Sequence, residues 1–121
     1  MSPKTRLLKP ITIGARIPVE LKLKLIKLNE NPEYRFESES KIIYRALDRF
    51  MTELPEVDSV ESQKRDERVI VRVPDDLKTK LKTLVKKNKY GAESESDIVC
   101  MALDKFINDE FIRLKMKGGN K

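Results

Sequence analysis

Residues 16–50 read RIPVELKLKLIKLNENPEYRFESESKIIYRALDRF, and residues 72–106 read RVPDDLKTKLKTLVKKNKYGAESESDIVCMALDKF. The two segments align without a gap at a constant offset of 56 residues, and 17 of their 35 positions are identical. Chance would match only a few of these positions, so the chain contains a tandem repeat. Each structural element can therefore be judged twice, once in each copy.

Both copies begin with a segment that alternates between apolar and other side chains before a proline. This period of two predicts a strand with one buried face, and Pro18 and Pro74 are expected to end the two strands. The apolar positions are Ile11, Ile13, Ala15 and Ile17 in the first copy, and Val69, Val71 and Val73 in the second.

The segment after each proline is ambiguous in the first copy, where residues 19–25 also alternate like a strand. The second copy removes the ambiguity, because Thr79 stands where the alternation requires an apolar residue. Leucines with the i, i+4, i+7 spacing of a helical face survive in both copies. They are Leu21, Leu25 and Leu28, and Leu77, Leu81 and Leu84. The spacing predicts helices over roughly 19–30 and 75–88.

A second helix is expected after the sequence ESES, which occurs in both copies. Ser38 and Ser94 are suitable N-caps, and Asp97 completes a pattern like a capping box in the second copy. A broad apolar stripe follows, and it predicts helices over roughly 39–53 and 95–112. Its members are Ile42, Ile43, Ala46, Leu47, Phe50 and Met51, and Ile98, Val99, Ala102, Leu103, Phe106 and Ile107.

Charge and composition narrow the class of protein. The net charge is +6 and the pI about 9.4, and two basic blocks flank an acidic connector, which favours a polyanionic partner. Cys100 is the only cysteine and histidine is absent, so we expect no disulfide, no metal site and no cofactor. Without a phosphate loop or a paired-carboxylate motif, an enzyme is not expected. No apolar run suggests a signal peptide or a membrane span, so we expect a cytoplasmic protein, or one in the host cytoplasm if the source is viral.

One strand-helix-helix copy is too small to bury a sufficient core, and a lone strand has unpaired edges. We therefore expect an α+β fold, mainly helical, in which the two strands pair antiparallel over four helices as an intramolecular pseudo-dimer. The expected division is a basic arm over 1–10, a first repeat over 11–53, an acidic linker over 54–66, a second repeat over 67–112 and a basic tail over 113–121.

A strand that ends in Arg-x-Pro, a helix, and then Ser-x-Ser-x-Ile-x-x-x-Ala-Leu resembles the ribbon-helix-helix superfamily of MetJ and Arc type. The match covers about 11–53 and 67–110, and the tandem arrangement is similar to that of small transcription regulators from archaeal viruses. In this family a two-stranded ribbon enters the major groove of DNA. The resemblance implies base contacts from the strand residues that alternate away from the core: Thr12, Gly14, Arg16, Arg68, Ile70 and Arg72.

The resemblance also implies that the N-terminus of the second helix of each copy clamps a DNA phosphate. The residues concerned are Ser38, Glu39, Ser40 and Lys41, and Ser94, Glu95 and Ser96. Lys4, Arg6 and Lys9 could form an arm on the DNA backbone. Two simpler interpretations stay open: the strand residues could be solvated, and the serines could only cap their helices.

The expected function is therefore that of a sequence-specific regulator of transcription, with repression as the expected direction. Its partner would be double-stranded DNA, without a small-molecule substrate. One chain would be a monomeric unit, and oligomerisation along DNA is left open. Two other functions also stay open: an antitoxin-like module that binds a protein, and a protein that coats DNA without choosing a sequence.

Overall fold

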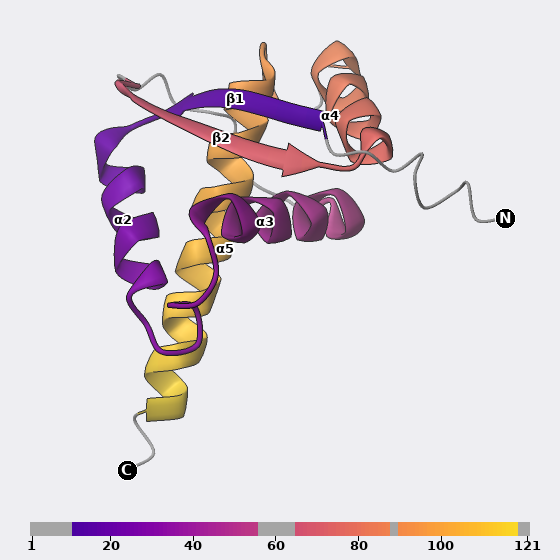
Figure 1. Cartoon of the computed structure of the whole chain (residues 1–121). Helices are drawn as coiled ribbons and strands as arrows, with labels where there is room; N and C mark the ends of the chain where they lie inside the picture. The colour runs from indigo at the N-terminus through magenta and orange to yellow at the C-terminus, as the bar shows by residue number, and fades with distance from the viewer. Residues whose placement is uncertain (1–10, 56–64, 88–89, 119–121) are drawn as a thin grey trace, which may run out of the picture.

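The computed structural model describes residues 11–55, 65–87 and 90–118. Within these ranges the order of elements repeats, and the chain is a small α+β protein, mainly helical (Figure 1). The first copy contains β1 (Ile11–Ile17), α2 (Val19–Asn29) and α3 (Glu39–Glu53), and the second contains β2 (Glu67–Val73), α4 (Asp75–Lys87) and α5 (Glu95–Gly118). The expected arm residues Lys4, Arg6 and Lys9, and linker residues 56–64, lie outside the described ranges.

The two strands form one antiparallel sheet, which confirms the expected pairing. Gly14 lies opposite Ile70 at the centre of the ladder, and these two residues are equivalent in the 56-residue repeat. The repeat therefore relates the two halves of the ladder by a local two-fold axis. Side chains alternate between buried and exposed along both strands, as the period of two predicts.

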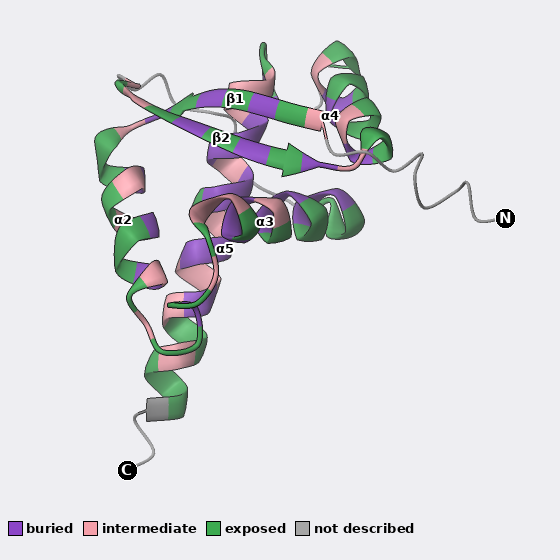
Figure 2. Cartoon of the chain, viewed as in Figure 1, coloured by how far each residue is buried: buried purple, intermediate pink, exposed green. Residues whose placement is uncertain are grey.

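The buried face of the ribbon packs on α3 and α5, which also pack against each other. The packing crosses between the copies, because α3 contacts β2 and α5 contacts β1. Helices α2 and α4 stand at opposite ends of the ribbon and turn their leucines inward (Figures 1 and 2). The predicted leucines and the apolar stripes of α3 and α5 are all buried.

Two tyrosines show how each copy completes the core of the other. The ring of Tyr34, in the turn before α3, meets Phe106 of α5 edge-on, with centroids 6.4 Å apart. At the equivalent place, the ring of Tyr90 lies 5.1 Å from that of Phe50 in α3. Edge-on and tilted aromatic pairs are favourable beyond the area that they bury. Neither copy would therefore keep this core on its own.

The expected end of the second-copy helix at residue 112, with a tail from 113, is wrong, because α5 continues to Gly118. Phe111 and Leu114 extend the apolar packing beyond residue 109, which corresponds to the end of α3. Arg113 and Lys117 bind Glu33 of the first copy at 2.8 and 3.1 Å. These contacts have no equivalent in the shorter α3, and they stabilise the additional turns.

A buried carboxylate anchors this extension. Glu110 is 4% exposed, and its Oε1 accepts hydrogen bonds from the Tyr34 hydroxyl at 2.7 Å and from Arg113 Nη2 at 2.7 Å. Arg49 approaches its other oxygen at 3.5 Å. Burial opposes the charged form, but these donors outweigh it and lower the pKa of Glu110 below its ordinary value of 4.5.

We expect acid to destabilise the fold partly through Glu110. A carboxyl group with a lowered folded pKa contributes stability above its unfolded pKa, and this contribution is lost as the pH falls through the folded pKa. Glu110→Gln should lower the melting temperature at pH 7 and should lose less further stability between pH 5 and pH 2 than the wild type. Thermal unfolding across this range measures both effects, and parallel curves for the two proteins would contradict the assignment.

Candidate nucleic-acid interface

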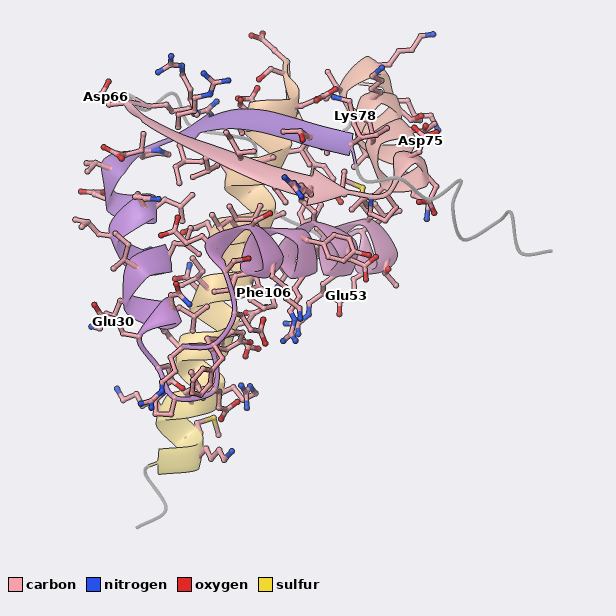
Figure 3. The ribbon with its side chains drawn as sticks, in the orientation of Figure 1. Glu30, Glu53, Asp66, Asp75, Lys78 and Phe106 are labelled. Atoms are coloured by element: carbon pink, nitrogen blue, oxygen red, sulfur yellow. The ribbon has the colours of Figure 1, made fainter. Side chains whose placement is uncertain are left out.

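The outer face of the ribbon carries all six residues expected to contact bases, and each of them is exposed. The register places them in three cross-strand pairs. Thr12 lies opposite Arg72, Gly14 opposite Ile70, and Arg16 opposite Arg68. Figure 3 shows side chains that end in nitrogen standing above the ribbon, on the side away from α3. The structure therefore brings these six residues together on one surface.

The three arginines of this surface have no counter-ion within the part of the chain that the structure describes. Among the described residues, no carboxylate pairs with the guanidinium of Arg16, Arg68 or Arg72. Lys22 of α2 and Lys78 of α4 differ from these arginines, because both lysines are ion-paired. Three guanidinium groups that are free to meet an anion therefore gather on the outer face of the ribbon.

The pair of Arg16 and Arg68 is unfavourable for the isolated protein. Like charges directly opposite each other in an antiparallel sheet destabilise the pairing. The neighbouring Gly14 leaves room for one of the two side chains: a Cβ atom placed on Gly14 would lie 3.3 Å from Nη2 of Arg68. The Arg68 side chain therefore extends across Gly14 toward the centre of the ribbon. An anionic partner that reaches both guanidinium groups would relieve their repulsion.

The central Ile70 is 53% exposed, whereas its neighbours Val69 and Val71 are buried. Its cross-strand partner, Gly14, has no side chain to cover it. An exposed apolar side chain at this place can contact the methyl group of a thymine, whereas the flanking arginines can donate two hydrogen bonds to one guanine. The surface thus combines donors at its ends with an apolar contact at its centre.

The N-termini of α3 and α5 lie beside the ribbon, and their caps are the ones that the sequence predicts. Ser38 Oγ accepts a hydrogen bond from the Lys41 N–H at 3.1 Å, and Ser94 Oγ accepts one from the Asp97 N–H at 3.4 Å. Helix capping therefore accounts for these two hydroxyl groups. The backbone N–H groups at the start of a helix have no intrahelical partner, and together with the helix dipole they favour an anion.

Ser40 and Ser96 have a role that sequence reasoning missed. Ser40 Oγ accepts a hydrogen bond from the Arg72 N–H at 3.1 Å, and Ser96 Oγ accepts one from the Arg16 N–H at 3.2 Å. The serines thus satisfy donors on the outer edges of the ribbon, which would otherwise be unpaired. The same bonds hold each helix N-terminus next to an arginine of the other copy. Each hydroxyl keeps its own hydrogen for donation.

Cys100 completes the outer edge of β1. Its Sγ donates a hydrogen bond to the carbonyl oxygen of Arg16 at 3.5 Å. Burial raises the pKa of this thiol to about 11, so that it stays protonated near neutral pH. The geometry gives Cys100 a structural role rather than that of a nucleophile.

The two acidic residues at these helix starts are neutralised by lysines of the preceding helix. Glu39 pairs with Lys22 and Glu95 with Lys78, each at 2.5 Å. Each carboxylate therefore forms an ion pair that joins the two helices of its own copy. Lys41 is exposed and leaves the start of α3 with a positive charge of its own.

Arg65 is a candidate site residue that the sequence assigned only to the linker. Asp97 takes the place that Lys41 holds in the first copy, and its carboxylate binds Arg65 Nη1 at 2.5 Å and the Glu93 N–H at 2.7 Å. Burial opposes ionisation of Asp97, but these two donors outweigh it and lower the pKa of the carboxyl group. An acidic residue at an expected anion site needs a neutralising cation. The sequence could therefore have indicated that a basic residue such as Arg65 pairs with Asp97.

Among the described residues, no helix is both long enough and apolar enough to cross a bilayer.

Comparison with models of known protein families, with curated protein sequences and with solved structures finds no match to this chain.

Proposed function

We propose that this chain is a tandem ribbon-helix-helix protein that binds double-stranded DNA. In this proposal the two copies form an intramolecular pseudo-dimer, and the β1–β2 ribbon enters the major groove. The observation that carries the proposal is the set of guanidinium groups on the exposed face of the ribbon that pair with no carboxylate of the described ranges. Basic side chains that bind the phosphates give a protein affinity for any DNA duplex. Contacts to the base edges make the binding specific for a sequence.

The starts of α3 and α5 are proposed to hold the phosphates on either side of the groove. Ser96 lies within hydrogen-bond distance of the Arg16 backbone, and Ser40 of the Arg72 backbone. A ribbon in the groove would therefore carry both helix N-termini toward the DNA backbone. The neutralised carboxylates of Glu39, Glu95 and Asp97 reduce the electrostatic opposition to a phosphate at these places.

As a regulator, the protein would recognise an operator and act as a repressor of transcription. The three ribbon arginines, which pair with no carboxylate among the described residues, favour this function over that of a protein-binding antitoxin. A cluster of basic side chains on one face is the electrostatic footprint of a nucleic-acid-binding protein. A protein that only coats DNA would need the basic surface but would make no use of the central Ile70.

Random-site selection with the full chain, followed by titration of the selected duplex and a scrambled duplex, tests the proposal. We expect the selected duplex to bind more tightly, and both affinities to fall steeply as salt rises, because bound counterions are released. Equal binding of the two duplexes would support a coating protein. No binding above background, even in low salt, would contradict the proposal altogether.

A further inference from the structure

Helix α2 has a second apolar face that points away from the core. Its members are Val19, Leu23 and Ile26, which are 49%, 59% and 37% exposed. They follow the i, i+4, i+7 spacing and lie opposite the buried leucines of the same helix. In Figure 2, α2 stands at one end of the molecule, with exposed residues on its outer side. Such a stripe of apolar side chains on a surface helix suits the packing of another helix.

The second copy shows that the fold does not require this face. At the equivalent positions α4 carries Asp75, Thr79 and Lys82, all exposed. The two helices share their inward leucines and occupy equivalent places at the two ends of the ribbon. The apolar stripe therefore belongs to α2 alone and has a use that α4 lacks.

The charges beside the stripe indicate what covers it. Glu20 and Lys27 are both exposed and lie seven residues apart along the same side of the stripe. Among the described residues no cation pairs with Glu20, and no carboxylate pairs with Lys27, whose Nζ lies 5.9 Å from the centroid of the Phe111 ring. When two copies of α2 cross antiparallel, Glu20 of each copy meets Lys27 of the other, whereas a parallel crossing leaves them apart.

We propose that the outer face of α2 is a docking surface for α2 of a second copy of this chain. Leu23 of one copy packs against Ile26 of the other, Val19 closes each end, and the two Glu20–Lys27 pairs lie along one side of the contact. The arrangement is two-fold symmetric, so each copy uses the same surface. Because the α4 end lacks this face, association stops at two chains and does not continue into a filament.

The association is expected to be reversible, because so few side chains meet that the interface is smaller than that of a stable complex. The chain is therefore a monomer in dilute solution and a dimer when concentrated. The proposal does not depend on DNA, so that it can fail while the proposed function holds, and the reverse.

Sedimentation equilibrium of the full chain without DNA, over a wide range of protein concentration, tests the proposal. The first variant carries Val19→Asp, Leu23→Thr and Ile26→Lys, which are the residues that α4 has at the same places. We expect the wild type to show a monomer–dimer equilibrium, and the variant to dissociate at least about tenfold more readily. Circular dichroism and thermal unfolding confirm that the variant is folded.

A charge exchange tests the antiparallel geometry. Glu20→Lys should weaken the dimer, and Glu20→Lys combined with Lys27→Glu should restore it. Asp76→Lys, at the equivalent place on α4, is the matched control and should leave the association unchanged. A wild type that stays monomeric at every concentration, a triple variant that dimerises as well as the wild type, or growth beyond a dimer would each overturn the proposal.

Discussion

A chain in which Arg16 and Arg72 are both replaced by alanine is expected to lose most of its preference among DNA sequences. The two residues are equivalent in the repeat and lie at opposite ends of the ribbon, where no carboxylate of residues 11–55, 65–87 or 90–118 pairs with them. A guanidinium group that donates two hydrogen bonds to guanine contributes about 1–3 kcal/mol of discrimination, or roughly 5- to 150-fold for each arginine. The substitutions keep the backbone N–H groups that Ser96 and Ser40 bind, so that the ribbon should keep its structure.

Titration of the selected duplex and of a scrambled duplex measures this effect as a ratio of affinities. Arg35→Ala combined with Lys86→Ala is the control, since it removes two exposed positive charges away from the ribbon. The control should weaken both duplexes by a similar and small factor. If the arginine variant also loses the same factor on every sequence, Arg16 and Arg72 contact phosphates and not bases.

Making the two strands alike is expected to change the symmetry of the preferred DNA site. The wild-type ribbon presents Thr-x-Gly-x-Arg on β1 and Arg-x-Ile-x-Arg on β2, so one chain should select an asymmetric site. Arg68→Thr combined with Ile70→Gly gives β2 the pattern of β1. Because a local two-fold axis passes between Gly14 and Ile70, the altered outer face is symmetric and should select a palindrome.

The reverse exchange, Thr12→Arg combined with Gly14→Ile, should also give a palindromic site, but a different one. The new side chain at residue 14 would displace the Arg68 guanidinium, which lies close to the Gly14 backbone. This guanidinium is the end of a flexible side chain, so the fold should tolerate the change. Random-site selection on the three proteins makes the comparison. A palindromic site for the wild type, or an asymmetric one for both variants, would contradict the arrangement of the reading surface.

Most of the fold was predicted from local patterns in the sequence. The period of two along β1 and β2 depends only on neighbouring residues, and so do the leucine spacings of α2 and α4. The second copy improved these predictions, since Thr79 excluded a strand where the first copy alone left the choice open. The six outward residues of the ribbon followed from the same alternation, because strand side chains point to opposite faces in turn.

The end of α5 could not be predicted in the same way. Residues 113–117 contain three basic side chains and resemble a solvated tail. Their helical structure depends on Glu33 and Tyr34, which lie about 80 residues earlier in the chain. No local propensity reports on a contact over such a separation.

The sequence by itself determined that two equivalent copies exist, which elements each contains, and which strand residues face outward. Only the tertiary structure decided that Ser96 binds the strand of the other copy 80 residues away, that Arg65 neutralises Asp97, and that α2 keeps an exposed apolar face. The physical reason is the range of the interactions. Periodicity is set by the geometry of the backbone within a few residues, whereas a hydrogen bond or an ion pair forms only where folding has brought distant groups together.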